Sequence, residues 1–290
     1  MSIEPDPQAN ARAASQTALA AAACRRRATQ HPHRFCDDPW AGALAGPDGE
    51  AVLDAILRAS PDEYPTLDVL VGLRVGYIDA HVIQSIEQDP WFRQVVILGA
   101  GLDTRAARLA RQGVTYYEVD PPASQADKQQ RLRALSGYPI DAARYVTCDF
   151  EHEDHLDRLQ ASGLSLEEPA LFVIEGVLHY LTEAMVQRAL APIARRCHPR
   201  SAVIFDYLSE GTVEENGAPD PAAVDGEPVL WTSVNPLTLL RDLGFRHIRT
   251  MPFDQLFLSM TGERRPTTAF LHTCHFARAA VEVPVSPYLW

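Results

Sequence analysis

Val95-Val96-Ile97-Leu98-Gly99-Ala100-Gly101-Leu102-Asp103-Thr104-Arg105 is the stretch that decides the fold of this 290-residue chain. Its first four residues form a continuous apolar run, which is typical of a parallel strand covered on both faces. A turn that contains two glycines follows, and the residues from 103 to 111 favour a helix. A strand, a glycine turn and a helix in this order predict the first unit of a Rossmann-like domain.

Strands and helices alternate from this stretch to residue 207. Further strands are expected at 115–119, 144–148, 171–174 and 202–205, with helices at 123–135 and 183–196. A short helix at 236–244 and two late strands, at 245–250 and 268–276, complete the pattern. The alternation predicts an α/β fold with a doubly wound, mostly parallel seven-stranded sheet.

The chain before this sheet is expected to be helical, over 15–30, 49–58 and 67–88. In the third helix Val75, Ile78, Val82 and Ile86 recur every three or four residues and form one apolar stripe. We therefore expect a helical N-terminal cap (1–90) and a cofactor-binding domain (91–290) that together form one compact unit. The polar segment 210–232 is expected to be a long loop, and loops of this length inside compact domains are usually functional or disordered.

The charge and the cysteines limit the classes of partner. A net charge of -12 argues against nucleic acid and against an anionic membrane surface. Five widely spaced cysteines without a CxxC motif indicate reduced thiols in the cytoplasm. No signal peptide or membrane span is expected, and the alanine-rich composition with a single lysine suggests a bacterial source. The expected partner is a small molecule that accepts a transferred group, and the chain could also form a homodimer.

The glycine turn points to an adenosine-type cofactor. Glycine allows close approach of a ligand to the backbone, and the acids Glu118 and Asp120 at the end of the second strand suit ribose hydroxyls. A dinucleotide site would need a third glycine where Thr104 stands, so S-adenosylmethionine fits better than NAD. A short-chain dehydrogenase is excluded, because Ser124 stands where a tyrosine would have to precede Lys128 by four residues.

Three motifs together resemble the leucine carboxyl methyltransferase family, which includes bacterial relatives acting on polyketides and other natural products. They are the stretch 95–105, the segment Glu118-Val119-Asp120-Pro121 with Lys128, and Glu175-Gly176-Val177-Leu178-His179-Tyr180-Leu181. Asp38-Pro39-Trp40 and the pair Arg74 and Asp79 fit the same family. The resemblance covers residues 15–207 and implies a class I S-adenosylmethionine-dependent methyltransferase.

The resemblance also implies roles for individual residues. Arg74 would hold the methionine carboxylate with help from Arg27, Asp120 would bind the ribose, and Glu175 would face the methionine amino group. The adenine would be flanked by Asp149 and Phe150. Asp149 could also cap a helix beginning near Glu151, in addition to this role or in place of it. The full set of expected cofactor residues is Arg27, Arg74, Gly99, Ala100, Gly101, Asp103, Asp120, Asp149, Phe150 and Glu175.

The acceptor group is left open between two chemistries. The resemblance favours a carboxylate, which is ionised at neutral pH and needs no base, whereas a hydroxyl acceptor would need a base such as His179. His179 could equally be a packed core residue, and a protein that binds the cofactor without transferring a methyl group is a further alternative. Tyr207 and Trp231 are expected to line the acceptor pocket. No metal is expected: His152 and His155, and His272 and His275, have HxxH spacing, but no further ligands complete either pair.

Overall fold

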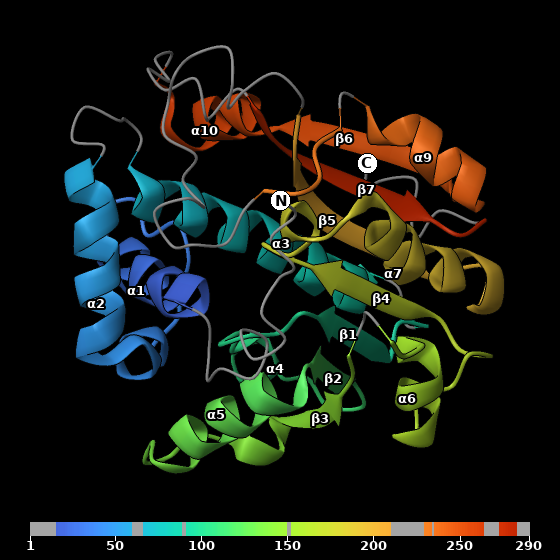
Figure 1. The fold of residues 1–290 in the computed structure, drawn as a ribbon, viewed down its shortest axis with the longest axis horizontal. Coiled ribbons are helices and arrows are strands. Elements are labelled where there is room, and N and C mark those ends of the chain that lie inside the picture. Colours follow the sequence, from blue (N-terminus) through green and yellow to red (C-terminus); the bar gives the residue numbers. More distant parts are fainter. Residues whose placement is uncertain are drawn as a thin grey trace, which may run out of the picture.

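The computed structural model describes residues 16–59, 66–88, 91–149, 152–209, 229–233, 235–263 and 273–282. A seven-stranded sheet with the order β3-β2-β1-β4-β5-β7-β6 runs through the molecule (Figure 1). The strands are β1 (Gln94–Leu98), β2 (Thr115–Asp120), β3 (Ala143–Thr147), β4 (Ala170–Ile174), β5 (Ala202–Leu208), β6 (Arg246–Pro252) and β7 (Cys274–Ala280). β7 runs antiparallel to both of its neighbours, β5 and β6, and the other neighbouring pairs are parallel. The predicted doubly wound, mostly parallel sheet is confirmed.

Helices cover both faces of this sheet. They are α1 (Gln16–Gln30), α2 (Ala41–Ala59), α3 (Leu67–Gln88), α4 (Arg105–Arg108), α5 (Pro122–Arg133), α6 (His155–Ala161), α7 (Glu183–Arg196), α9 (Pro236–Leu243) and α10 (Phe253–Thr261), with short 3-10 helices η2 (Ile140–Ala142) and η3 (Leu178–Tyr180). Apolar residues of α3 and α10 pack on one face, and those of α6, α7 and α9 on the other. Coverage on both sides explains why β1, β4 and β5 are buried along their whole length.

The N-terminal helices form a cap that shares α3 with the sheet. α1 and α2 lie side by side and α1 also contacts α3 (Figure 1). Gly72 of α3 allows close packing against α1, since a Cβ added there would lie 2.4 Å from the Cβ of Ala28. Val71 and Val75 of α3 belong to the cap core, while Leu73 and Ile78 face the sheet core. Residues on opposite sides of one helix therefore join the cap to the sheet.

Three helices differ from the sequence-based expectation. The helix expected at 49–58 begins earlier, at Ala41. Gly46 (φ +61) divides it into two segments, and Pro47 opens the second, where a missing N–H costs little. The helix expected over 103–111 is the single turn α4. The helix expected near Glu151 begins at His155, and its N-terminus is capped by Asp154 rather than Asp149.

The C-terminal part contains a helix that the sequence analysis did not predict. α10 follows Pro252, buries Phe253, Leu256 and Phe257 on one face, and ends at Gly262 with φ +74. A strand was expected at 268–276, and β7 begins at Cys274. Residues 268–272 of the expected strand lie outside the described residues. Residues 210–228 of the loop expected at 210–232 also lie outside the described residues.

α3 has the composition of an apolar span but the position of a core helix. Within the described ranges it is the one helix whose length and mean hydropathy, 1.2, would suit a membrane crossing. Of its most apolar window, 61% is buried inside the protein. Its Arg74 and Asp79 form ion pairs with residues of the sheet edge and of α4. Both the burial and the internal ion pairs are expected of a helix in a folded core.

Candidate cofactor site

The topology brings the ends of three strands together. The order of strands reverses at β1, which lies between β2 and β4. Leu98 pairs with Val119 on one side and with Ile174 on the other, so Asp120 and Glu175 lie on either side of the glycine turn. Ligands of open α/β sheets bind at the carboxyl ends of strands at such a reversal. Residues from the three separate motifs therefore meet at one sheet edge.

The two glycines of the turn adopt backbone conformations that disfavour other residues. Gly99 has φ +68 and Gly101 has φ +41. A Cβ on Gly99 would lie 2.4 Å from Cγ2 of Val177, so the turn after β4 occupies the space that we expected to be open for a ligand. A Cβ on Gly101 would meet no atom closer than the Cβ of Ala18, at 3.6 Å. Gly99 is thus required by packing within the protein, whereas the space beside Gly101 is less filled.

Asp120 closes the turn from the end of β2. Its carboxylate accepts a hydrogen bond from the Gly101 N–H. The residue is 7% exposed, and burial raises its pKa although the Gly101 hydrogen bond and the charge of Lys128 oppose the rise. The other predicted acid, Glu118, is fully buried in an ion pair of 2.6 Å with Lys128. The structure therefore leaves Asp120, rather than Glu118, as the acid at the turn.

Arg74 reaches from α3 to the ends of β4 and β5. Its Nε donates to Oε1 of Glu175 at 2.9 Å, and its Nη1 donates to Oδ2 of Asp206 at 3.3 Å. The other oxygen of Asp206 accepts from the Gly176 N–H at 2.7 Å. Gly176 has φ +66, and a Cβ there would lie 3.1 Å from Nη2 of Arg74. A tight glycine turn therefore lets the chain pass directly beneath the guanidinium group.

A second arginine, Arg105, ties this pair to the glycine turn. Arg105 is 1% exposed and forms ion pairs with Asp79 (2.6 Å), Asp103 and Glu175. Burial alone would raise the pKa of Glu175, but the charges of Arg105 and Arg74 outweigh burial and hold it below its usual value. The pKa of Asp103 falls to about 2 because Arg105 and other cations outweigh its burial. These carboxylates therefore remain ionised at neutral pH.

The structure brings Arg25, rather than Arg27, to the turn. Arg25 donates from Nη2 to the carbonyl oxygen of Leu102 at 2.6 Å and from Nε to Asp38 at 2.8 Å. Arg27 instead pairs with Glu50 and Asp54 of α2. Residues two apart on a helix face different sides, so both arginines cannot point to the same site. The expected cofactor role of Arg27 has no support in this arrangement.

Sequence reasoning missed the roles of Arg25 and Arg105, although signals for both were present. Asp38 belongs to the quoted Asp38-Pro39-Trp40 segment, and an acid among apolar neighbours needs a cation. Arg105 closes the fold-deciding stretch itself, and Asp79 was singled out beside Arg74. The sequence does not show how these charges pair, because the pairing depends on how α1 and α3 pack against the glycine turn.

The adenine side of the site is described only in part. Asp149 follows β3 by two residues, next to Cys148, whose N–H donates to the carbonyl oxygen of Asp120 at 3.0 Å. Oδ2 of Asp149 lies 3.0 Å from Nδ1 of His152. This places Asp149 at the same sheet edge as Asp120, as expected. Phe150 lies outside the described residues.

The predicted acceptor residues lie on another part of the sheet edge. Successive residues of a strand point to opposite faces, so Tyr207 points away from the face on which Asp206 meets Arg74. Tyr207 and Trp231 belong to the apolar core beneath α7 and α9, and Tyr207 stacks on His275 at 5.2 Å. Burial raises the pKa of Tyr207 to about 12. The positions of Tyr207 and Trp231 add no support to their expected role as walls of the acceptor pocket, and that role stays a prediction.

His179 lies in η3, directly after the motif that contains Glu175. It is 8% exposed, and its ring centroid lies 4.1 Å from that of Tyr180. Its carbonyl oxygen accepts hydrogen bonds from the N–H groups of Leu230 (2.8 Å) and Trp231 (3.2 Å). The backbone of His179 therefore anchors the segment that follows residue 228. A role of its imidazole as a base stays a prediction.

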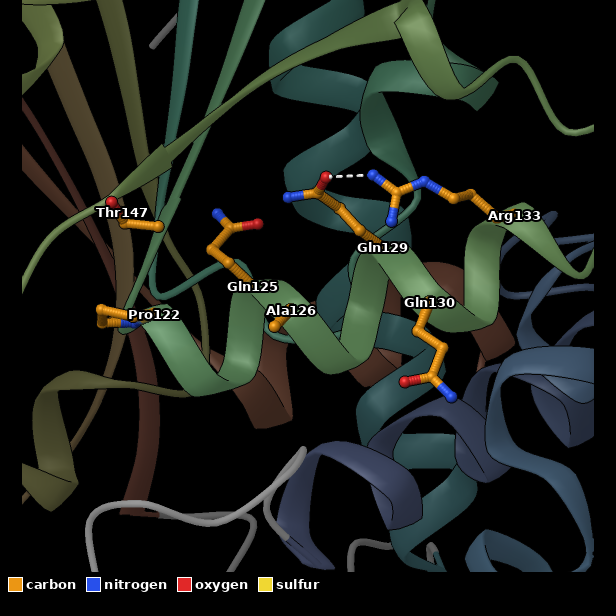
Figure 2. Close-up of a pocket in the computed structure, with 7 residues that line it drawn as sticks. All are labelled: Pro122, Gln125, Ala126, Gln129, Gln130, Arg133 and Thr147. Carbon is orange, nitrogen blue, oxygen red and sulfur yellow. Dashed lines mark hydrogen bonds between the residues drawn. The ribbon is translucent and has the colours of Figure 1, made fainter.

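A hollow of about 520 Å³ between α5 and the end of β3 is separate from this site (Figure 2). It is lined by Pro122, Gln125, Ala126, Gln129, Gln130, Arg133 and Thr147. The lining contains none of the expected cofactor residues, and Arg133 donates to Gln129 along the outside of the helix. We therefore locate the cofactor site by its charged residues and not by this hollow. Within the described ranges, no three His, Cys, Asp or Glu side chains are grouped to hold a metal ion.

The charged residues at the sheet edge fit S-adenosylmethionine. Arginine binds a carboxylate through paired hydrogen bonds, and carboxylates bind ammonium groups and ribose hydroxyls. Arg74 and Glu175 thus supply the two charges that an amino-acid group requires, at the mouth of a turn closed by Asp120. The same groups currently bind each other, so the pair must open to admit such a ligand.

Comparisons with known proteins agree with this reading. A family model described as leucine carboxyl methyltransferase matches residues 16–194. A Mycobacterium avium (strain 104) protein named as an S-adenosyl-L-methionine-dependent methyltransferase is 31% identical over 203 residues, which cover 66% of this chain and 66% of its own. A similarly named protein of Parafrankia sp. (strain EAN1pec) is 32% identical over 211 residues, which cover 69% of this chain and 66% of its own. The match spans just under two thirds of these relatives.

Solved structures share the fold. A DUF574 family protein from Streptomyces avermitilis has a TM-score of 0.61 at 16% identity, covering 87% of this chain and 98% of its own. A Thermobifida fusca protein described as a methyltransferase has a TM-score of 0.53 at 14% identity, covering 97% of this chain and 100% of its own. At these identities the likeness shows the fold alone.

Proposed function

This chain belongs to the leucine carboxyl methyltransferase family of S-adenosylmethionine-dependent enzymes, and from that premise we propose that it methylates a carboxyl group of a small natural product, such as a polyketide-like acid. The observation that carries the proposal is the Arg74–Glu175 pair beside the glycine turn. It offers one cation and one anion to an amino-acid group at the sheet edge where Asp120 is available to a ribose.

Each group has a defined task in this proposal. Arg74 binds the carboxylate of the cofactor and Glu175 its ammonium group, while Asp120 accepts hydrogen bonds from the ribose. When bound, S-adenosylmethionine would supply a methyl group on a positively charged sulfur: an oxygen nucleophile would attack the methyl carbon in line, and the sulfur would leave as the neutral thioether of S-adenosylhomocysteine. The protein contributes by orienting the two reactants, which can supply up to ~7–11 kcal/mol of the barrier.

A carboxylate acceptor suits the titratable groups of the site. Glu175 and Asp103 are held ionised by arginines, and their lowered pKa values make them weak bases. A hydroxyl acceptor would therefore depend on His179, whereas a carboxylate arrives already ionised at neutral pH. A small acceptor acid that carries its own charge needs only to be aligned with the methyl group. These points support an ester product over an ether product.

The experiment measures both the product and the pH dependence. Radioactive methyl groups from the labelled cofactor would be transferred to a panel of small acids and phenols, and a methyl ester would release volatile methanol in mild alkali. The rate should be flat from about pH 6 to 9, since the pKa of Glu175 lies below this range and that of Arg74 above it. Glu175 would lose its charge only as the pH falls through its lowered pKa.

His179→Gln separates the two acceptor chemistries. With a carboxylate acceptor the variant should retain its rate, as should the control His247→Gln, whose side chain is exposed on β6. An alkali-stable product, with a rate that rises through about pH 6.5 and is lost in His179→Gln but not in the control, would establish a hydroxyl acceptor instead. Cofactor binding without turnover on either class of acceptor would favour a binding protein.

A further inference from the structure

We propose that Asp206 is a positioning residue for the cofactor: it keeps Arg74 in place when the Arg74–Glu175 ion pair opens to admit the amino-acid group. The proposal rests on the proposed function for the identity of the cofactor. Asp206 lies on β5, outside the three motifs and outside the residues expected to contact a ligand. Its carboxylate is directed at two elements of the site at once.

The structure shows why such a residue is needed. Without a ligand, Arg74 and Glu175 neutralise each other across 2.9 Å. A ligand that carries both a carboxylate and an ammonium group competes with Glu175 for Arg74 and with Arg74 for Glu175. Separating the pair leaves two charges that are largely buried, 18% and 10% exposed, and such charges are stable only with another partner.

Each half of the pair has its own second partner. Glu175 keeps the ion pair between its Oε2 and Arg105. Arg74 keeps Asp206, which lies 3.3 Å from its Nη1. The guanidinium is thus held from the β5 side while its remaining edge can turn toward a ligand carboxylate. Arg105 and Asp206 therefore have matching roles on the two sides of the opening.

Asp206 also fixes the backbone that carries Glu175. Its Oδ1 accepts the Gly176 N–H at 2.7 Å, at a residue whose φ of +66 places the chain against Arg74. One carboxylate hence sets the distance between the guanidinium and the start of the turn after β4. Loss of its charge should loosen the recognition of the amino-acid group while leaving the nucleoside end, at Asp120, unchanged.

The test compares two ligands that share a nucleoside. S-adenosylhomocysteine carries the amino-acid group, and 5′-methylthioadenosine lacks it. Calorimetric titration of Asp206→Asn should show at least a tenfold loss of affinity for S-adenosylhomocysteine and less than a twofold change for 5′-methylthioadenosine. The control Asp157→Asn, at an exposed acid of α6 paired with Arg196, should change neither.

Asp206→Ser is a second variant that controls for an artefact of the asparagine side chain. An asparagine amide could direct its NH₂ group against Nη1 of Arg74, whereas serine removes the charge without adding an opposing donor. A folded variant of either kind with unchanged affinity for S-adenosylhomocysteine would overturn the proposal, as would an equal loss for both ligands. Failure of the wild-type protein to bind either ligand would overturn the cofactor assignment, and the proposal with it.

Discussion

Gly99→Ala is the substitution whose cost can be worked out most directly from the structure. Gly99 has φ +68, where a residue with a side chain pays roughly 1–2 kcal/mol relative to glycine. The added Cβ would also lie 2.4 Å from Cγ2 of Val177, and overpacking of this kind costs about 1–3 kcal/mol. We therefore expect the free energy of unfolding to fall by roughly 2–5 kcal/mol.

Gly101→Ala is the matched control, because it has only the backbone cost. Gly101 has φ +41, but its added Cβ would make an ordinary contact, 3.6 Å from the Cβ of Ala18. Its expected loss is roughly 1–2 kcal/mol. Val177→Ala removes the methyl group that Gly99→Ala would strike, so the double variant should recover about 1–3 kcal/mol relative to the sum of the single variants.

Urea unfolding followed by circular dichroism measures all four variants against the wild-type protein. The slope with urea should be unchanged, so that differences in midpoint report stability. A Gly99→Ala variant no less stable than Gly101→Ala would refute the argument. Additive costs in the Gly99→Ala, Val177→Ala pair would show that the turn after β4 does not press on the glycine turn.

Three other predictions concern the charges around this turn. Lys128 is the chain's only lysine and is 1% exposed beside Glu118. An amine-specific reagent should therefore leave it unmodified in the native protein and modify it in urea, as peptide mass spectrometry would show. Rapid modification of Lys128 in the native protein would contradict the structure. Asp120→Ala should weaken S-adenosylmethionine about tenfold or more in calorimetry, since hydrogen bonds to a charged group contribute roughly 1.5–3 kcal/mol, and unchanged affinity would remove Asp120 from the site. Arg105→Met deprives Asp103 of its ion pair and should lower the free energy of unfolding, measured by urea titration, by about 3–5 kcal/mol. A loss below about 1 kcal/mol would show that the ion pairs are not formed in solution.

The sheet was predictable from the sequence because its signal is local. β1, β4 and the first part of β5 are short apolar runs, and α3 and α7 have the bounds that the sequence analysis expected. α10 was not predicted, because no element was assigned between the strands expected at 245–250 and 268–276, although Pro252 and Gly262 frame it. α4 is shorter than expected because the chain must turn after one helical turn to reach β2.

The site was predictable only where a motif ends a strand. Asp120 and Glu175 follow strands of the sheet, so parallel packing brings them to the same edge. Arg27 was assigned from the family resemblance alone, and the sequence does not show which side of α1 faces the turn. Tyr207 was expected at the acceptor pocket because of its aromatic side chain; strand alternation directs it away from Asp206, and its role stays a prediction.

The central claim is that Arg74 and Glu175 exchange each other for the two charges of an amino-acid group. A crystal structure with S-adenosylhomocysteine tests it most directly. The account predicts the ligand carboxylate on Arg74, its ammonium group on Glu175, and its ribose beside Asp120, with Arg74 still bound to Asp206. A ligand bound elsewhere, with the Arg74–Glu175 pair still closed, would contradict it.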